Sequence, residues 1–418
     1  MEAMFNVIIL IAAMILRQPN SVLSNVIEER VLSSGNRINF TELASLYGLK
    51  ANEYNVTTED GYILGLFHIP GSNHSRPVLL IHGIDLSSDC YLIRGDNSLG
   101  ITLARRGFDL WFANLRGNIY SRRNIYLNPD TDPEFWNFSF NENGIYDLPA
   151  IIDIVMNKTK APKLNVIGHS QGNTGMLVLG AKRPEYNEKI NKLIYLAPVS
   201  YLSHVSPVLS AFISISPLLN LIGEAAGLNE FLGYNQRLTK LYRAVCTSPV
   251  SAYAICANLI TFPVVGFDPT ELGPTFYRVT NYYLPVGASR KSLIHYGQIG
   301  IRGVFAEYDY GAVKNVAVYN SSLPPVYNLS RVDFQSVLLV GNNDGVASVK
   351  DAERLRDELP NVESFRILPR KKMTHLDFIV DREPDPGHGV EVQHEVHVDE
   401  DAKPGQPRHQ RDLDNTYS

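Results

Sequence analysis

Runs of positive charge are scarce in this sequence. Lys and Arg number 38 against 43 Asp and Glu, the net charge is −5, and Arg370 to Lys372 form the one compact basic cluster. A protein that follows nucleic acid phosphates needs a basic surface. We therefore expect no nucleic acid partner.

Long apolar runs are also few. The first, Phe5 to Leu16, spans 12 residues, is interrupted by Asn6 and is followed by Arg17. A membrane-spanning helix needs about 20 apolar residues, so we expect no stable transmembrane span. The pattern predicts a signal peptide over residues 1–24, cleaved near Ser24. Because the extreme N-terminus carries Glu2 and neither Lys nor Arg, a short membrane anchor stays open as the alternative.

Cysteine is rare, with three residues in the chain. In an oxidising compartment we expect two of them to pair. Cys246 and Cys256, ten positions apart, are the favoured pair. Cys90 is then left as a free thiol, which we expect to be a small buried apolar residue.

Asn-x-Ser/Thr sequons are more frequent than the roughly two that chance would give. They indicate the secretory pathway, with an extracellular or lysosomal destination. We expect Asn137 to be too packed for modification, since it lies in the aromatic stretch from Phe135 to Phe138. The remaining candidates for glycosylation are Asn39, Asn55, Asn73, Asn157, Asn320 and Asn328.

Apolar residues make up 44% of the chain and charged residues 19%, which is typical of a globular protein. Alternating segments at 53–58 and 62–69 flank Glu59-Asp60-Gly61 and predict an antiparallel hairpin. Short continuous apolar runs, typical of parallel strands, follow at 78–81, 108–113, 164–167, 193–196, 337–340 and 364–368. Helix-length segments lie between them at 98–106, 146–158, 170–181 and 349–358. The alternation predicts an α/β fold with a mostly parallel, doubly wound sheet.

The alternation stops over residues 199–297, which are apolar and rich in Pro and Ser. We interpret this stretch as a helical cap, or lid, inserted between two parts of the α/β core, 25–198 and 298–380. Its most apolar part, Pro207 to Ile222, fits a lid over an acyl-binding cleft or simply the buried core of the cap. Residues 381–418 are rich in Asp, Glu, His and Pro, and we predict a disordered polar tail.

The strongest chemical motif is Gly168-His169-Ser170-Gln171-Gly172, placed between an apolar strand and a helix. In this setting the glycines permit a tight turn that exposes the serine hydroxyl at the helix start. Alone, Gly-x-Ser-x-Gly is weak evidence, but the strand and helix around it are the required context. We predict Ser170 as a nucleophile.

A serine nucleophile needs a histidine base and a carboxylate that orients it, in the chain order serine, acid, histidine for this fold. Asp344 directly follows the apolar run 337–340, and His375 follows the run 364–368. We predict these two as the partners of Ser170. The rival acids are Asp309, which follows no clear strand, and Asp377, which is too close to His375 and is expected to be a local cap or surface residue. The rival histidines, His204 and His295, fall at the cap boundaries.

Backbone N–H groups of Gln171 and Ile84 are the predicted oxyanion donors. Gln171 opens the nucleophile helix, and Ile84 follows Gly83 in the loop after the first parallel run. For His82 a packed or hydrogen-bonded loop position is favoured over a chemical role. His388, His394 and His397 fit a solvated tail better than a metal site, so we expect no metal, and the chemistry requires no cofactor.

Several motifs together resemble the acid lipase family, which includes gastric, lysosomal and insect lipases. They span about Leu43 to Val380 and comprise Ile81-His-Gly, Asp96-Asn-Ser-Leu-Gly, Asn114-Leu-Arg-Gly-Asn118, Phe135-Trp-Asn-Phe-Ser-Phe140, Tyr146-Asp-Leu-Pro149, the motif around Ser170 and His375-Leu-Asp-Phe378. The sequence departs from the family after Val380, where the polar tail replaces a final helix, and near Val264 and Val265, where the family often has a third cysteine.

The resemblance implies a lipase that hydrolyses esters of neutral lipids, triacylglycerols or sterol esters, at a lipid–water interface. It implies the same triad, the same oxyanion donors and the same disulfide that the residues indicated. Two alternatives stay open, namely a transferase or small-ester esterase on the same triad and a catalytically silent lipid-binding or storage protein.

Overall fold

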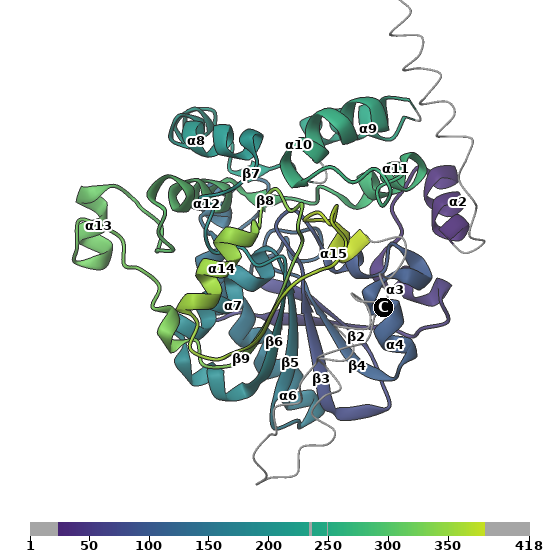
Figure 1. Cartoon of the computed structure of the whole chain (residues 1–418), viewed down its shortest axis with the longest axis horizontal. Coiled ribbons are helices and arrows are strands. Elements are labelled where there is room, and N and C mark those ends of the chain that lie inside the picture. Colours follow the sequence, from purple (N-terminus) through teal and green to yellow (C-terminus); the bar gives the residue numbers. More distant parts are fainter. Residues whose placement is uncertain (1–23, 234–235, 249, 381–418) are drawn as a thin grey trace, which may run out of the picture.

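The structure, a computed structural model, describes residues 24–233, 236–248 and 250–380. Its outline is a twisted sheet with helices on both faces and a layer of helices above one end (Figure 1). The expected signal peptide and the expected disordered tail lie outside the described residues, apart from Ser24, where helix α2 begins.

The sheet has eight strands in the order β1-β2-β4-β3-β5-β6-β9-β10. Strand β2 is antiparallel to β1 and β4, and every other neighbouring pair is parallel. The predicted hairpin and the predicted parallel sheet are both confirmed. The strands are β1 (Asn52–Thr57), β2 (Ile63–Ile69), β3 (Asn73–Ile81), β4 (Phe108–Ala113), β5 (Leu164–His169), β6 (Ile190–Leu196), β9 (Gln335–Val340) and β10 (Val362–Ile367).

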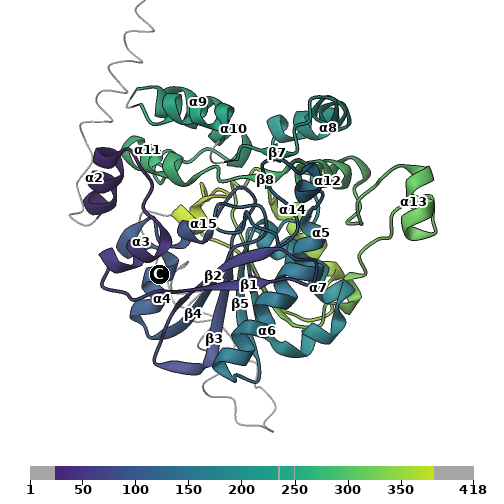
Figure 2. The ribbon, with the colours of Figure 1, turned by 180° about the vertical axis from the view of Figure 1, so that it is seen from behind.

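The central strands are apolar because both of their faces are covered. In β3, Val78 and Leu80 belong to a buried cluster on one face, and Leu79 and Ile81 belong to a second cluster on the other. Figure 2 shows the helices of the second face from behind. The first face is covered by α3 (Phe40–Leu46), α4 (Leu99–Arg105) and α15 (Asp377–Val380), and the second by α6 (Leu148–Thr159), α7 (Gln171–Lys182) and α14 (Val349–Glu358). Helix α2 (Ser24–Ser34) lies beside α11 (Pro274–Tyr283), above the sheet.

A long helical segment separates β6 from β9 and lies above the carboxyl end of the sheet (Figures 1 and 2). We call its helices the cap helices. They are α8 (Pro207–Ala225), α9 (Arg237–Cys246), the π-helical η6 (Ala252–Thr261), α10 (Phe262–Val265), α11 (Pro274–Tyr283) and α12 (Arg290–Arg302), with the two-residue strands β7 (Glu230–Phe231) and β8 (Ala288–Ser289) between them. Helix α13 (Ala312–Tyr319) follows at the side of the molecule.

Helix α8 packs closely on α12 through small residues. A Cβ atom built on Gly297 would lie 2.3 Å from the Ser216 hydroxyl oxygen, so the two helices approach each other at this point. Much of the rest of α8 is exposed, including Leu218 at 56% and Leu221 at 64%. Within the described ranges α8 is the one helix whose length and composition would allow it to cross a membrane, but a single such helix is weak evidence for a span.

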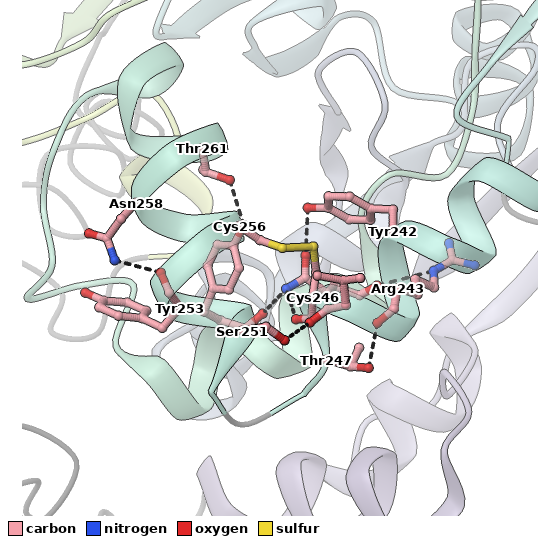
Figure 3. Close-up of a disulfide and its surroundings, with 12 residues drawn as sticks. Tyr242, Arg243, Cys246, Thr247, Ser251, Tyr253, Cys256, Asn258 and Thr261 are labelled. Atoms are coloured by element: carbon pink, nitrogen blue, oxygen red, sulfur yellow. Dashed lines mark hydrogen bonds between the residues drawn. A yellow bond between two sulfur atoms is a disulfide. The ribbon is translucent and has the colours of Figure 1, made fainter. Parts of the chain in front are cut away.

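A disulfide joins α9 to η6, as Figure 3 shows. It links Cys246 and Cys256, whose Cα atoms are 5.7 Å apart. The predicted pairing is therefore confirmed. Cys90 is a buried free cysteine, as expected.

Candidate active site

Ser170 lies on the sharp turn between β5 and α7. Its φ of 51° and ψ of −116° are a backbone conformation that residues with a Cβ atom adopt at a cost. Ser170 N–H bonds to the carbonyl of Leu196, and the carbonyl of Ser170 accepts from Asn173 N–H. These bonds hold the strained turn in place at the carboxyl end of the sheet.

Gly168 and Gly172 are required by close approach on either side of Ser170. A Cβ atom on Gly168 would lie 2.3 Å from Asn173 Oδ1, and one on Gly172 would lie 2.4 Å from the carbonyl oxygen of Ile81. Neither position has room for a side chain. The two glycines of the motif therefore allow the turn to pack closely, Gly168 against α7 and Gly172 against β3.

Ser170, His375 and Asp344 form one hydrogen-bonded chain. The hydroxyl of Ser170 is 2.9 Å from His375 Nε2, and His375 Nδ1 is 2.9 Å from Asp344 Oδ2 and 3.1 Å from Oδ1. When Nδ1 donates to the carboxylate, Nε2 is left as an acceptor for the serine hydroxyl. All three residues are buried. This is the arrangement that lets a histidine take the proton of a serine that attacks an ester.

Asp344 is fixed by the loop that follows β9. Its Oδ1 accepts hydrogen bonds from the backbone N–H groups of Val346 at 2.8 Å and Ala347 at 2.7 Å. The loop therefore orients the carboxylate toward His375.

The loop that carries His375 is joined to the cap and to a buried ion pair. His375 N–H bonds to the carbonyl of Val265 at 3.2 Å. Asp377 accepts from Thr374 N–H at 2.6 Å and pairs with Arg370 at 2.8 Å. Asp377 is fully buried, and burial raises its pKa to about 6. Of the two expectations for Asp377, the surface position is wrong, because Arg370 lies close enough to compensate the buried carboxyl, whereas the hydrogen bond from Thr374 N–H agrees with a local cap.

The other rival residues lie in separate settings. His204 Nδ1 is 2.9 Å from Asp351, and His295 is buried with its Nδ1 3.0 Å from the Ser139 hydroxyl. Asp309 accepts a hydrogen bond from Asn315 at 2.7 Å. These contacts are structural, and none of them involves Ser170.

Gly83 brings the loop after β3 against the serine turn. A Cβ atom on Gly83 would lie 3.0 Å from both Ser170 Cβ and His169 Nδ1. Ile84 follows and lines the same cavity as Ser170, and Gln171 is the first residue of α7. The two residues predicted as oxyanion donors therefore lie on the two segments that meet at Ser170.

Two buried histidines support these loops. His82 Nδ1 is 2.7 Å from the carbonyl of Gly83 and its Nε2 accepts from Leu115 N–H. His169 Nε2 is 2.9 Å from the carbonyl of His375. Burial lowers the pKa of His82 to about 4 and that of His169 to about 3, so both are neutral. The contact from His169 was not foreseen from the sequence, because the partner is 206 residues away.

A cavity of about 450 Å³ lies between the triad and the cap helices. Ser170 and His375 line its floor together with Ile84 and Asp85. Its wall is mostly apolar and includes Leu209, Phe212, Ile213, Phe231, Ile260, Leu272, Leu284 and Leu293. Such a wall favours an aliphatic or sterol group beside the serine.

The glycosylation candidates are mostly at the surface. Asn39, Asn55, Asn157, Asn320 and Asn328 are exposed, whereas the side chain of Asn73 is outside the description. Modification of these six residues stays a prediction.

Asn137 is also exposed, so the expectation that it is packed is wrong. The aromatic rings on either side of it are buried, but its own side chain points to Glu134 and Lys291, at 2.7 and 2.9 Å.

Among the residues that the structure describes there is no cluster of three or more metal-ligating side chains. The histidines of the tail, His388, His394 and His397, lie outside the described residues.

Known lipases are similar to this chain over more than four fifths of its length. A family model described as a partial alpha/beta-hydrolase lipase region matches residues 40–95, and one described as an alpha/beta hydrolase fold matches residues 76–218. Lipase 1 of Drosophila melanogaster is 35% identical over 84% of this chain and 78% of its own. The gastric triacylglycerol lipase of Mus musculus is 34% identical over 82% of this chain and 87% of its own. The lysosomal acid lipase/cholesteryl ester hydrolase of Macaca fascicularis is also 34% identical, over 82% and 86%.

The chain belongs to the acid lipase family. This lipase is a carboxylic ester hydrolase with the α/β-hydrolase fold, as its motifs predicted.

Proposed function

We propose that this acid lipase hydrolyses carboxylic esters of neutral lipids, triacylglycerols or sterol esters, through an acyl-enzyme on Ser170. The observation that carries the proposal is the hydrogen-bonded chain from Ser170 through His375 to Asp344 at the floor of an apolar cavity. No cofactor takes part in this chemistry. The geometry supplies a nucleophile and a base, and the cavity supplies a place for an aliphatic or sterol group.

In the first half of the proposed reaction, His375 Nε2 takes the proton of the Ser170 hydroxyl while its oxygen attacks the ester carbonyl. Asp344 stabilises the imidazolium that forms. The backbone N–H groups of Ile84 and Gln171 donate hydrogen bonds to the oxyanion. Each such hydrogen bond typically raises the rate by a factor of about 100 to 1000. His375 then gives the proton to the alcohol, which leaves.

In the second half, a water molecule gives a proton to His375 and attacks the acyl group on Ser170. The tetrahedral intermediate again places its negative oxygen at the two N–H groups. Collapse returns the proton to Ser170 and releases the fatty acid. Both halves need the same three side chains, which is why a single hydrogen-bonded chain suffices.

The cap offers a surface for a lipid–water interface. Its exposed apolar side chains include Leu218, Leu221, Leu238, Leu241, Val250 and Leu259, each more than half exposed. A soluble monomer rarely leaves so many large apolar side chains in water without a use for them. We infer that the cap helices lie on the lipid while the triad acts beneath them.

The lipase is proposed to enter the secretory pathway and to act outside the cell or in the lysosome. The disulfide between Cys246 and Cys256 suits an oxidising compartment. Exposed sequons at Asn39, Asn55, Asn157, Asn320 and Asn328 suit glycosylation in the same pathway.

A fluorophosphonate probe, with rates on three substrates, tests the proposal. The wild type is expected to be labelled and to hydrolyse a long-chain triacylglycerol or a cholesteryl ester between pH 4 and 8, and Ser170→Ala is expected to lose both properties. Turnover restricted to short-chain esters would indicate a small-ester esterase. A folded, secreted wild type that neither reacts with the probe nor cleaves any ester would indicate a silent lipid-binding protein and overturn the proposal.

A further inference from the structure

Asp85 places a carboxyl group on the floor of a mostly apolar cavity. It follows Ile84 in the loop after β3 and lines the cavity together with Ser170 and His375. Its Oδ1 is buried and has no hydrogen-bond partner among the described residues. A buried carboxyl oxygen without a donor is costly, so its place beside the nucleophile calls for an explanation.

The backbone explains part of the choice of residue. Asp85 has a φ of 56°, a left-handed conformation that Asp, Asn and Gly adopt more easily than other residues. Its carbonyl accepts a hydrogen bond from Val286 N–H at 3.1 Å. Asn or Gly would serve this backbone equally well without a charge. The conformation therefore accounts for a small residue here, but it does not account for a carboxyl group.

The other titratable groups that line the cavity are engaged elsewhere. Each tyrosine hydroxyl in the cavity has a hydrogen-bond partner. These pairs are Tyr242 with Asn281, Tyr277 with Thr261, and Tyr296 with Thr174. His169 bonds to the carbonyl of His375, and His375 bonds to Ser170 and Asp344.

None of these groups bonds to Asp85, and Leu284 and Pro285, which precede Val286, add apolar surface to the cavity. Burial alone raises the pKa of Asp85 to about 7. When a lipid fills the cavity and displaces water from it, a donor for this carboxyl has to come from the lipid itself.

We propose that Asp85 is a specificity-determining residue that accepts a hydrogen bond from a hydroxyl group of the substrate. Since Asp85 is next to Ile84, a proposed oxyanion donor, that hydroxyl lies close to the ester that is cleaved. The favoured substrates are then neutral lipids with a free hydroxyl near the scissile bond. A mono- or diacylglycerol carries one on its alcohol side, and an ester of a hydroxy fatty acid carries one on its acyl side. This inference rests on the proposed hydrolysis of neutral-lipid esters, and within that class it favours partial glycerides and hydroxy-acid esters over triacylglycerols and sterol esters, which carry no free hydroxyl.

Capping the hydroxyl of the substrate tests the proposal directly. In mixed micelles, kcat/KM is measured for 1,2-dioleoylglycerol and its O-methyl ether, and for the methyl esters of a hydroxylated fatty acid and its O-methyl derivative. At pH 8, above the pKa of about 7 that burial gives Asp85, the wild type is expected to prefer the free hydroxyl in one pair by about 10- to 100-fold, the range of a hydrogen bond to a charged group. The pair that shows the preference identifies the side of the ester that Asp85 contacts.

Two variants test whether the preference for the free hydroxyl depends on the carboxyl group of Asp85. Asp85→Gly keeps the left-handed backbone but removes the acceptor, and is expected to bring the ratio to about one and to raise the rate on the capped substrate. Asp85→Asn keeps an acceptor without charge and is expected to retain part of the preference. Equal ratios in the wild type and in Asp85→Gly would overturn the proposal.

Binding to Ser170→Ala separates this inference from the proposed function. Displacement of a fluorescent acyl probe measures the affinity for the free and the capped diacylglycerol, with and without Asp85→Gly. If the wild type hydrolyses nothing but binding still depends on both the hydroxyl and Asp85, the proposed function fails and the inference stands. If binding and hydrolysis are both indifferent to Asp85, the inference fails whatever the activity.

Discussion

Replacing Asp85 by Asn removes a titrating group from the cavity while keeping a side chain of similar size. Asn tolerates the left-handed backbone that the position requires, at a φ of 56°. The change therefore isolates the free energy of burying the charge. The observable is the pH dependence of thermal stability, which the wild type and Asp85→Asn should show differently.

The magnitude follows from the pKa of the buried carboxyl. Burial raises the pKa of Asp85 from 3.8 to about 7, and each pKa unit corresponds to about 1.4 kcal/mol. The ionised form thus costs the native state at most about 4 kcal/mol. We expect about 2–4 kcal/mol, because the residue keeps partial exposure to the cavity and water there lowers the cost.

The sign is set by which state binds the proton more tightly. The native pKa lies above the unfolded one, so between about pH 4 and pH 7 the folded protein holds more protons than the unfolded chain. Stability of the wild type therefore falls as pH rises through this window, and Asp85→Asn lacks this contribution. Asp377, whose pKa is also raised, is common to both proteins and cancels in the comparison.

Calorimetry at pH 4, 5, 6, 7 and 8 provides the measurement. For a chain of this size about 1 kcal/mol corresponds to about 1 °C in Tm. The Tm of Asp85→Asn minus that of the wild type is expected to grow by about 2–4 °C from pH 4 to pH 8. A difference that is the same at every pH would refute the reasoning, and a difference that shrinks would mean that a cation pairs with Asp85.

Four other changes probe the site and the cap. Ser170→Gly should be more heat-stable than Ser170→Ala by about 1 kcal/mol, since Gly relieves the strained φ while both lose the hydroxyl; equal stability would argue against strain. Gly172→Ala should destabilise by about 1–3 kcal/mol and abolish fluorophosphonate labelling, because its Cβ would lie 2.4 Å from the Ile81 carbonyl. Arg370→Met should cost about 3–5 kcal/mol by leaving buried carboxylates unpaired, and adding Asp377→Asn should recover part of it in thermal unfolding. Replacing both disulfide cysteines by Ser should speed proteolysis between α9 and η6, as the cross-link is worth about 3 kcal/mol; unchanged cleavage would contradict this.

The parts of the fold that were predicted are those with local signals. The apolar run 108–113 is β4 residue for residue, and 349–358 is α14, which starts directly after Ser348. The side chain of Ser348 accepts a hydrogen bond from Asp351 N–H and so caps the helix. Ser170, Asp344 and His375 were predicted as a triad because each follows a strand that could be recognised from its apolar residues, and in the structure they lie within hydrogen-bond distance of one another. Parallel strands then bring their ends to one edge.

The parts that were missed depend on contacts between distant segments. Burial of Asp377 depends on Arg370, and exposure of Asn137 depends on how the aromatic stretch turns beside α12. The neighbours of Asp85 come from the cap, 200 residues later in the chain, as the bond between Asp85 and Val286 shows. No local pattern distinguishes a carboxyl in a cavity from one on a loop.

The carbonyl of Val265 links cap helix α10 to the loops that carry the proposed base and its carboxylate. It accepts hydrogen bonds from Gly345 N–H at 3.1 Å and from His375 N–H at 3.2 Å, one on each of the loops that carry Asp344 and His375. A cap that lifted away at this point would pull on the base and on its carboxylate together. Ser206 N–H, at the start of α8, bonds to the carbonyl of Gly345 at 2.7 Å, so a displacement of α8 would also reach the loop that carries Asp344.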